Sequence, residues 1–311
     1  MLHFSRTSPR SWLAFELNVL RRLKFSSAAF PFTSTPTLGN YLKRWDVRVM
    51  ANDPLQSAWT KATAFIPNNG EKLTADDINL VLDDAYVPKY KLQNMALRNW
   101  FTETDSWWFD NVRQNIEKLQ TPVLRAMAST LAMATGDYVL SFTEETREIR
   151  QPLSNVFRRL WTLQPEPYNN GRNNTCQNKP ANEFLAETTG ADLMFLRLPT
   201  AQTLHLKASL GQTAWREEWL RGGDDFWDAA EGEQLGKLGM PSETKSQYLR
   251  LLEETLSTAS HIGNFAIAHV ENGSITVHDL TEAIGKIRRV EAVYTKDFSE
   301  LTGAKAVIIT A

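Results

Sequence analysis

The sequence places few side chains in arrangements that suit chemistry, and the clearest is an acid at the end of a predicted strand. Val47–Ala51 alternates like a β-strand and runs into Asn52-Asp53-Pro54. A carboxylate at this point suits the hydroxyls of a ribose, because it accepts two hydrogen bonds in a fixed plane. Asp is equally a preferred N-cap for a helix that starts at Pro54. The local sequence leaves both interpretations open.

Other patterns typical of catalysis or of metal binding are missing from the sequence. There is no glycine-rich phosphate loop, no Walker pattern and no G-x-S-x-G elbow. The five histidines are scattered, without H-E-x-x-H or His-x-His spacing. Cys176 is the only cysteine, which excludes an internal disulfide framework or a cysteine-built zinc site. We therefore expect no bound metal.

The charge balance limits the possible partners. The chain has 34 basic and 36 acidic residues and a formal net charge of -2. This excludes a wholly basic wrapper of nucleic acid but permits a local basic face. Basic clusters occur at residues 6–24, 147–172 and 286–289, and they could meet phosphates if they share a face. The candidate contacts to DNA are Arg147, Arg150, Arg158, Arg159 and Arg172.

The first 25 residues allow two interpretations. They hold five basic side chains against one acid, Glu16, which is compatible with a mitochondrial transit peptide. A first helix with a solvated basic face is the simpler interpretation. No secretory signal is visible, and no apolar run reaches the roughly 18 residues of a membrane span. We expect a cytoplasmic protein that does not enter a membrane.

The order of predicted elements indicates an α/β fold. A helix at 10–24, a strand within 26–33, a short helix at 40–43, the strand at 47–51 and a helix at 55–66 open a doubly wound sheet. From 74 to 163 apolar residues recur at three- and four-residue steps, which predicts helices. The cluster Trp107-Trp108-Phe109 is expected to be core. We predict an α/β domain of residues 1–73 and 166–311 that carries a helical insertion at 74–165.

The α/β pattern returns after a loop rich in Pro, Asn and Gly at 164–179. The predicted helices lie at 180–188, 214–221 and 243–258, the last capped by Ser242. Ala191–Leu196 is a short apolar run typical of a buried parallel strand. A strand at 265–270 is predicted to turn at Asn272-Gly273 into Ile275–Val277, and a terminal antiparallel pair lies at 289–294 and 304–309.

Several segments together resemble a known family. The segments are Phe32-Thr33-Ser34-Thr35-Pro36, the strand ending at Asp53, Tyr168–Arg172, Pro180–Leu185 and Ala191–Thr200. Their order resembles that of the Dam-like, DPPY-containing adenine-specific DNA methyltransferases, which transfer a methyl group from S-adenosylmethionine (SAM) to the exocyclic amine of adenine. In that family the first segment reads FxGxG and the last reads like DVVYLDPPY. The resemblance implies a Rossmann-like SAM-methyltransferase mixed sheet with helices on both faces. It also implies that Phe32, Ser34, Pro36 and Asp53 are vestiges of a cofactor site.

The same segments depart from the family at its functional positions. Ser34 and Pro36 stand where the family has glycines, which let backbone pass close to SAM. In place of the DPPY tetrad the chain has Arg197, Leu198, Pro199 and Thr200. Arg cannot accept a hydrogen bond from the adenine amine, and Thr cannot stack on the flipped base. We expect no catalytic residue here, and SAM only if a pocket survives.

The leading hypothesis is a catalytically degenerate relative of the DNA adenine methyltransferases that acts by binding DNA or a partner protein. One alternative is a divergent but active SAM-dependent DNA adenine methyltransferase. The other is a structural protein whose Trp-rich middle forms a homo-oligomer interface.

Overall fold

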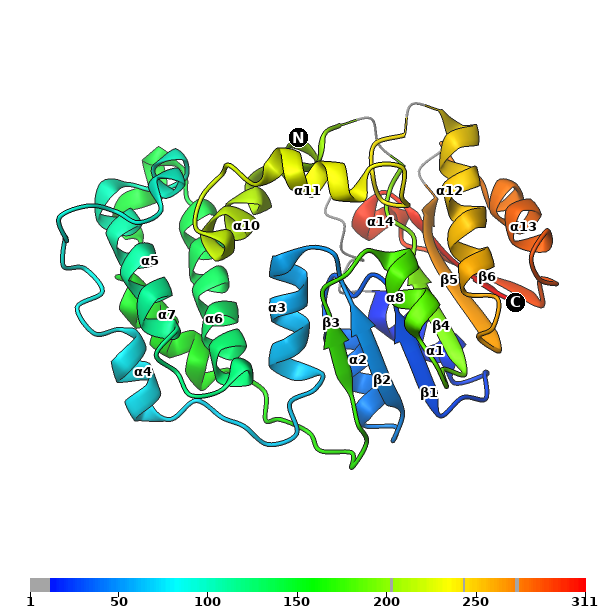
Figure 1. Cartoon of the computed structure of the whole chain (residues 1–311), viewed down its shortest axis with the longest axis horizontal. Helices are drawn as coiled ribbons and strands as arrows, with labels where there is room; N and C mark the ends of the chain where they lie inside the picture. The colour runs from blue at the N-terminus through cyan, green and yellow to red at the C-terminus, as the bar shows by residue number, and fades with distance from the viewer. Residues whose placement is uncertain (1–11, 202–203, 243, 272–273) are drawn as a thin grey trace.

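A seven-stranded mixed sheet forms the centre of the protein (Figure 1). The computed structural model describes residues 12–201, 204–242, 244–271 and 274–311. The strand order is β3-β2-β1-β4-β5-β7-β6. The pairs up to β5 are parallel, whereas β7 runs antiparallel to both of its neighbours, β5 and β6. The strands are β1 (Ser27–Phe30), β2 (Arg48–Asn52), β3 (Thr175–Gln177), β4 (Leu193–Arg197), β5 (Asn264–Glu271), β6 (Ala292–Asp297) and β7 (Lys305–Thr310).

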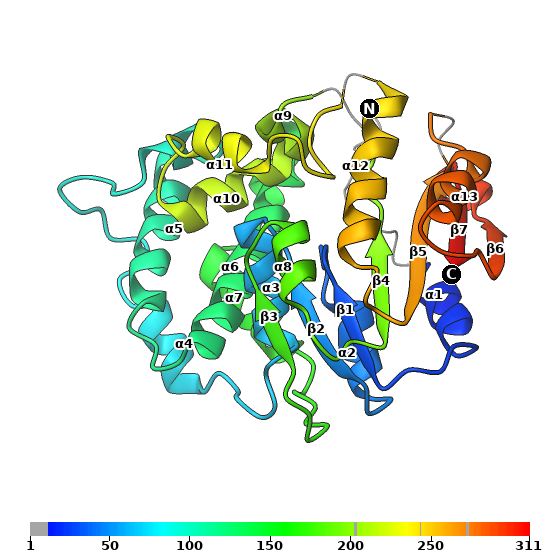
Figure 2. The same cartoon turned by 45° about the vertical axis from the view of Figure 1, so that its right-hand side comes forward.

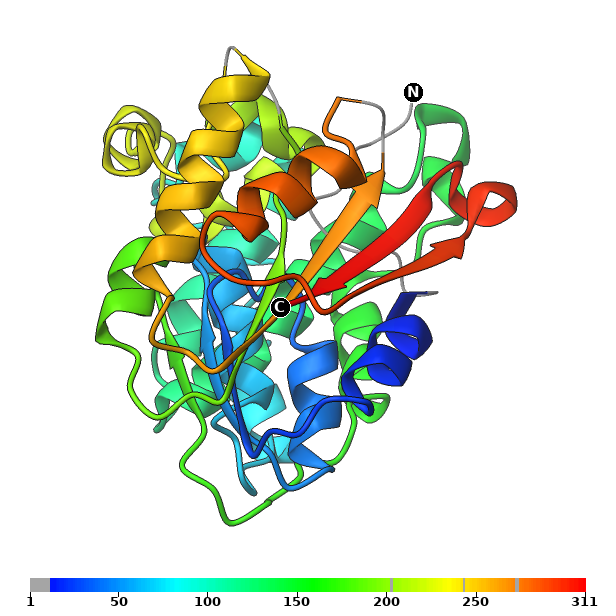
Figure 3. The same cartoon turned by 90° about the vertical axis from the view of Figure 1, so that its right-hand side faces the viewer.

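Helices cover both faces of the sheet because its inner strands are apolar on both sides. Every residue of β4 is buried, and successive side chains of a strand point to opposite faces. Leu193 and Phe195 pack with helices α1 to α3, whereas Met194 and Leu196 pack with the opposite layer. Figure 3 shows α12 and α13, in gold and orange, on one side and α1, in blue, on the other. The two layers are α1 (Leu13–Leu20), α2 (Thr37–Lys43) and α3 (Gln56–Phe65), and α8 (Ala181–Glu187), α12 (Lys245–Thr258) and α13 (Val277–Gly285).

The stretch between α3 and β3 is helical, as its apolar spacing predicts. Its helices are α4 (Ala75–Val81), η2 (Met95–Asn99), α5 (Glu103–Ile116), α6 (Pro122–Leu140), η3 (Glu144–Ile149) and α7 (Leu153–Thr162). Thr121 caps α6 by accepting from the Leu124 amide, and Pro122 occupies its first turn. Trp107 and Trp108 are 7% and 0% exposed, so both indoles are core within a single chain, as expected.

A third group of helices crosses above the carboxyl ends of the strands and joins the helical stretch to the sheet (Figures 1 and 2). It comprises α9 (Leu206–Leu210), η4 (Gly211–Thr213), α10 (Ala214–Arg221) and α11 (Trp227–Gln234), and we call it the crossing segment. Its indoles Trp215 and Trp219 belong to the same core as Trp108. Gly136 of α6 lets α10 approach, because a Cβ there would lie 2.2 Å from the Trp215 ring.

Two fully buried glutamates of α10 hold the crossing segment in place. The carboxylate of Glu217 accepts from the amides of Gln56 and Ser57, at 3.0 and 2.7 Å, and so caps α3 from outside that helix. The carboxylate of Glu218 accepts from the indoles of Trp100 and Trp227, at 2.6 and 2.9 Å. One helix therefore connects α3, the helical stretch and α11.

Some predicted boundaries are wrong. Ile275–Val277 is not a strand: Thr276 and Asp279 form a capping box, and α13 begins at Val277. Thr244, and not Ser242, caps α12, by accepting from the Gln247 amide. The first strand of the terminal pair lies three residues later than predicted, although the antiparallel pairing itself is confirmed.

Two other expectations fall on residues outside the description. The turn at Asn272-Gly273 is one, and the other is the possible transit peptide of residues 1–25, of which residues 1–11 lie outside the description. The predicted first helix is present from Leu13 to Leu20. Across the residues that are described, no helix is both long and apolar enough to cross a bilayer.

Candidate functional site

The strand order reverses between β1 and β4, which makes their carboxyl ends the natural place for a ligand. β1 lies between β2 and β4. After β1 the chain forms β2 and β3 on one side of that strand, and it then crosses to form β4 on the other side. In open α/β sheets the connections diverge at such a point and leave a crevice. The structure brings the predicted residues together here. The Ser34 amide donates to Asp53 Oδ2 at 2.8 Å, and Arg197 Nη1 donates to the Thr33 carbonyl at 3.4 Å.

A buried ion pair occupies the end of β4. Arg197 donates from Nε to Glu16 Oε1 and from Nη2 to Glu16 Oε2, both at 2.8 Å. The Arg197 side chain is 8% exposed and the Glu16 side chain 1%. The guanidinium also lies 5.4 Å from the centre of the Phe195 ring. The arrangement is the bidentate geometry in which Arg and carboxylate bind each other most strongly. Helix α1 therefore neutralises the cation at the end of β4.

The residues after Arg197 are tied to neighbouring loops. The Leu198 amide donates to the Ala268 carbonyl at 2.9 Å, which extends the pairing of β4 with β5. The Tyr248 hydroxyl of α12 donates to the Pro199 carbonyl at 2.8 Å, and burial raises the pKa of Tyr248. The Pro199 carbonyl, which follows β4, therefore already accepts a hydrogen bond. Thr200 is half-buried and presents no ring.

Gly239 lies against the same proline. A Cβ at Gly239 would lie 3.4 Å from the Pro199 ring and 3.7 Å from the Phe32 ring, and its φ is +96°. Glycine is therefore suited to this position, where the chain between α11 and α12 passes over the ends of β1 and β4.

Asp53 turns the chain from β2 toward α3. Its Oδ1 accepts from the Leu55 amide at 3.0 Å, while its Oδ2 accepts from Ser34. The residue is 3% exposed. Asp53 is not the N-cap that the sequence allowed: α3 begins at Gln56 with Leu55 as its N-cap and no side-chain cap bond, so the Leu55 amide bond closes a turn before the helix. The amides of the first turn of α3 are bound by Glu217 instead.

The turn after β1 has an unusual backbone. Ser34 has φ +47°, in the left-handed region that L-residues other than Asn and Asp seldom adopt. Pro36 follows with φ −75° and immediately precedes α2. Phe32 and Pro36 are both half-buried. The turn is therefore held in a conformation that glycine would adopt more easily.

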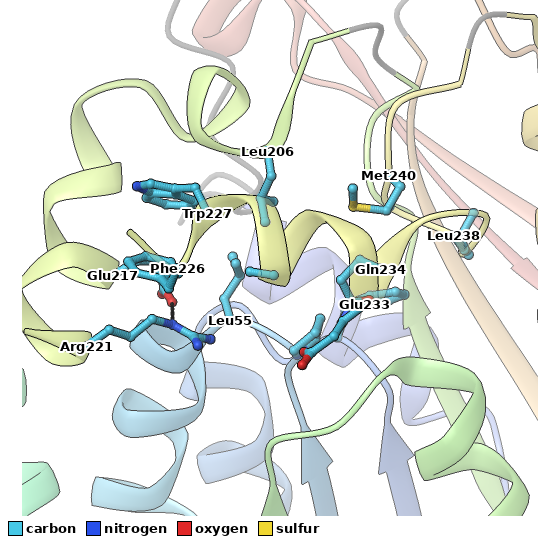
Figure 4. A pocket seen from close by; sticks show the side chains of 14 residues that line it. Leu55, Leu206, Glu217, Arg221, Phe226, Trp227, Glu233, Gln234, Leu238 and Met240 are labelled. Atoms are coloured by element: carbon cyan, nitrogen blue, oxygen red, sulfur yellow. Dashed lines mark hydrogen bonds and ion pairs between the residues drawn. The ribbon is translucent and has the colours of Figure 1, made fainter. Parts of the chain in front are cut away.

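A hollow lies beside this turn, beneath α11 (Figure 4). It contains about 490 Å³ of space between atoms, part of it open to solvent. Its walls are mainly apolar and aromatic, and Phe32, Leu55 and Trp227 are among them. At one end Arg221 donates to Glu217 at 3.4 Å and lies 4.7 Å from the Phe226 ring centre. Asp53 and Arg197 do not line it.

The arginines proposed as DNA contacts are mostly engaged with neighbouring side chains. Arg150 makes two 2.9 Å bonds to Asp105, which is buried. Arg172 donates to Asp46 at 2.7 Å, and this bond lowers the pKa of Asp46. Arg158 donates to the neutral Asn79 side chain at 3.0 Å, and it is exposed, as are Arg147 and Arg159. Arg150 lies on the helical stretch and Arg172 against the sheet, so the set is divided between two parts of the molecule.

Other buried ionisable groups have perturbed pKa values without facing the site. Burial lowers the pKa of Lys43 to about 8, although its ammonium donates to the Asn68 carbonyl at 2.7 Å. Burial also lowers the pKa of Lys61 to about 8, with a further contribution from Arg216. Burial raises the pKa of Cys176 to about 12. No three potential metal-ligating side chains gather anywhere in the described part of the chain.

The sequence did not reveal the partners that decide the character of the site. Glu16, Glu217 and Tyr248 lie far along the chain from Arg197, Ser57 and Pro199, to which they bind. The only sequence signal is that Glu16 is a single acid among the basic residues of the first segment. No protein-family model matches the chain, and no curated protein sequence matches it significantly.

Proposed function

We propose that this protein has a methyltransferase-like fold, does not transfer methyl groups and acts by binding DNA or a partner protein. A mostly parallel sheet with helices on both faces, a helical insertion and a terminal antiparallel hairpin are the features that a resemblance to the Dam-like family implies. Ser34 adds support, because it has a left-handed backbone at the position where that family has a glycine.

The observation that carries the proposal is the Arg197–Glu16 pair. Methyl transfer to adenine needs an acceptor at the end of β4 that orients the amine toward the methyl group. Here that position holds a guanidinium, which has donors only, and its partner carboxylate is 1% exposed. Bringing an adenine amine to this point requires breaking a buried bidentate pair, which costs several kcal/mol, about 3–5 by analogy with other buried pairs.

Two further features of the site argue against methyl transfer. The Pro199 carbonyl, in the segment that stands for the tetrad, already accepts from Tyr248, which uses one of its two lone pairs. Thr200 has no ring to stack on a base. Loss of orientation at one such centre costs on the order of a hundredfold in rate, and here the side-chain acceptor and the stacking residue are both lost.

The cofactor side is occupied by contacts within the chain. The carboxylate that would hold the ribose, Asp53, binds the Ser34 and Leu55 amides instead. The apolar hollow beneath α11 is adjacent, but neither Asp53 nor Arg197 reaches it. We therefore expect SAM to bind weakly or not at all.

The test uses the purified full chain with methyl-labelled SAM and adenine-containing DNA, beside an active adenine methyltransferase as positive control. We expect no label in the DNA, and no heat on titration of SAM into the chain by calorimetry. Methyl-adenine in the product would establish the divergent active enzyme instead. If SAM binds with micromolar affinity but no methyl group is transferred, the protein is still inactive as an enzyme, and the expectation that it has lost its cofactor site is wrong.

Light scattering over a concentration series tests the third alternative. Trp107 and Trp108 are buried within one chain, so they are not available to an interface without unfolding. We expect a constant mass across the series. A rise in mass with concentration would favour a structural role through self-association.

A further inference from the structure

A loop between α4 and η2 projects from the helical stretch, in cyan at the left of Figures 1 and 2. It covers residues 83–94, and we call it the projecting loop. Its side chains include the most exposed aromatic residue among the large hydrophobic residues described, Tyr90, whose ring is completely in solvent. Val87 is about half exposed, and Lys89 and Lys91 flank Tyr90 on either side. A loop that displays apolar surface in this way requires an explanation.

The projecting loop is held in one conformation by α5. The side-chain amide of Asn111 donates to the carbonyls of Asp84, Ala85 and Val87, at 3.2, 3.1 and 2.9 Å. At the other end of the loop, the Asp110 carboxylate accepts from the backbone amides of Gln93 and Asn94, at 2.9 and 3.1 Å. Both ends are therefore fixed to the same helix.

These anchors are buried polar groups. Asn111 is 1% exposed and Asp110 3%. The Tyr86 hydroxyl accepts from the Leu153 amide at 2.7 Å, and Leu92 of the loop is itself buried. Burying polar side chains is unfavourable unless they are hydrogen-bonded. Here the Asn111 amide nitrogen and the Asp110 carboxylate bond the loop backbone, whereas the Asn111 Oδ1 is buried without a partner. The result is a loop with both ends fixed, which reduces the conformational entropy lost when the tip binds.

The tip of the projecting loop carries lysines and no acid, although Asp83 and Asp84 at the start of the loop balance them in number. Residues 85–102 contain no Asp or Glu, and they contain Lys89, Lys91 and Arg98, in a chain whose net charge is -2. Arg98 pairs with Glu103 at 3.4 Å. Lys89 donates to the neutral side chain of Gln114 at 2.9 Å and so keeps its charge uncompensated there. An apolar pocket on a protein would explain Tyr90, but not the lysine on each side of it.

We propose that the tip of the projecting loop, Pro88–Lys91, is a contact site for single-stranded nucleic acid. An exposed aromatic ring offers a base a face to stack on, and two flanking ammonium groups attract the phosphates on either side. This inference rests on the binding function proposed above and selects nucleic acid over a protein partner. The bonding is non-covalent and tolerant of sequence, since every base has a face that stacks.

The test measures fluorescence polarisation of labelled oligo-dT with the full chain at about 50 mM salt and upward. Tyr90→Ala is expected to weaken binding by about fivefold or more, through loss of base stacking. The double variant Lys89→Ala with Lys91→Ala is expected to make the plot of log binding constant against log salt concentration less steep by about 1.4, from two lost phosphate contacts. The matched controls are Tyr168→Ala, another exposed tyrosine, and Lys296→Ala with Lys305→Ala on the exposed β6–β7 hairpin; both should leave binding unchanged.

Three outcomes overturn the inference. They are no binding of oligo-dT at about 50 mM salt, binding that the Tyr90 and lysine variants leave unchanged, and a preference for duplex over single strand of equal length. Ultraviolet crosslinking followed by peptide mapping distinguishes the two proposals. A crosslink only outside residues 83–94 would show that the protein binds nucleic acid at another site, which overturns the role of the projecting loop. A crosslink at Tyr90 is the expected result.

Discussion

The guanidinium of Arg197 and the carboxylate of Glu16 face each other through two parallel 2.8 Å bonds, although 181 residues separate them in the chain. Breaking such a pair leaves an uncompensated buried charge. Glu16→Ala should lower the free energy of unfolding by about 3–5 kcal/mol. Replacing both residues by leucine should cost less than either single change, because no buried charge remains. Urea unfolding of the single and double variants measures this, and additive losses would contradict it.

Ser34 should accept glycine with a gain in stability. At φ +47° a side chain clashes with the backbone at a cost of about 1–2 kcal/mol, which glycine avoids. Part of that gain is offset by the greater freedom of glycine in the unfolded chain. Ser34→Gly should therefore be more stable than Ser34→Ala by about 1 kcal/mol, a comparison in which both variants lack the hydroxyl. A less stable glycine variant in thermal unfolding would show that the strain is not present.

Gly136 should not tolerate a methyl group. A Cβ at this position would lie 2.2 Å from the Trp215 ring, so α10 would have to move away from α6. Gly136→Ala should lower stability by about 1–3 kcal/mol, although alanine favours helix. Gly232→Ala in α11 is the matched control, since nothing lies within 4 Å of its Cβ, and it should be neutral or stabilising. Equal effects of the two substitutions would contradict the close approach.

Lys61 should make stability depend on pH above neutrality. Burial lowers its pKa from 10.5 to about 8, so between these values the unfolded chain binds more protons than the folded chain. The contribution of Lys61 to the free energy of unfolding therefore rises as pH increases from about 8 to 10.5. Lys61→Met should be more stable than the parent at pH 7, by up to about 3 kcal/mol, with a difference that shrinks toward pH 10.5. Lys24→Met, at an exposed position, controls for the loss of one charge.

Cys176 should react slowly with alkylating reagents in the folded chain. Burial raises its thiol pKa to about 12, and the sulfur lies 3.8 Å from the Trp59 carbonyl oxygen. The thiolate is the reactive form, so alkylation at about pH 8 should be slower than in the denatured chain by on the order of a thousandfold. Mass spectrometry of iodoacetamide-treated samples, with and without guanidinium, follows the reaction. Comparable rates in both states would show that the thiol is accessible.

Local patterns predicted most of the framework because they reflect interactions between near neighbours. The apolar run at Ala191–Leu196 indicated β4, whose buried position requires side chains that are apolar on both faces. The three- and four-residue steps between apolar residues of 74–163 indicated helices for a similar reason, since side chains at that spacing share one face of a helix. The boundary at Thr276 was missed because its capping box, formed with Asp279, was read as part of a hairpin.

The charge interpretation could not distinguish exposed cations from paired ones, for a different reason. Arg150 and Arg172 were grouped by their closeness in sequence, but each is bound to an acid from another segment, Asp105 and Asp46. The projecting loop was not singled out, since its exposure depends on anchors that lie in α5. An absence of acids over residues 85–102 was its only visible signal.

The sequence by itself determined the alternation of helices and strands, and it determined that Arg197 cannot accept a hydrogen bond, because both follow from residue type and near neighbours. Only the tertiary structure decided that Glu16 neutralises Arg197, that Tyr248 binds the Pro199 carbonyl and that Glu217 caps α3. These contacts join residues that are tens to hundreds of positions apart. They exist because packing brings the carboxyl ends of separate strands together, and no local pattern specifies which distant side chain will fill that space.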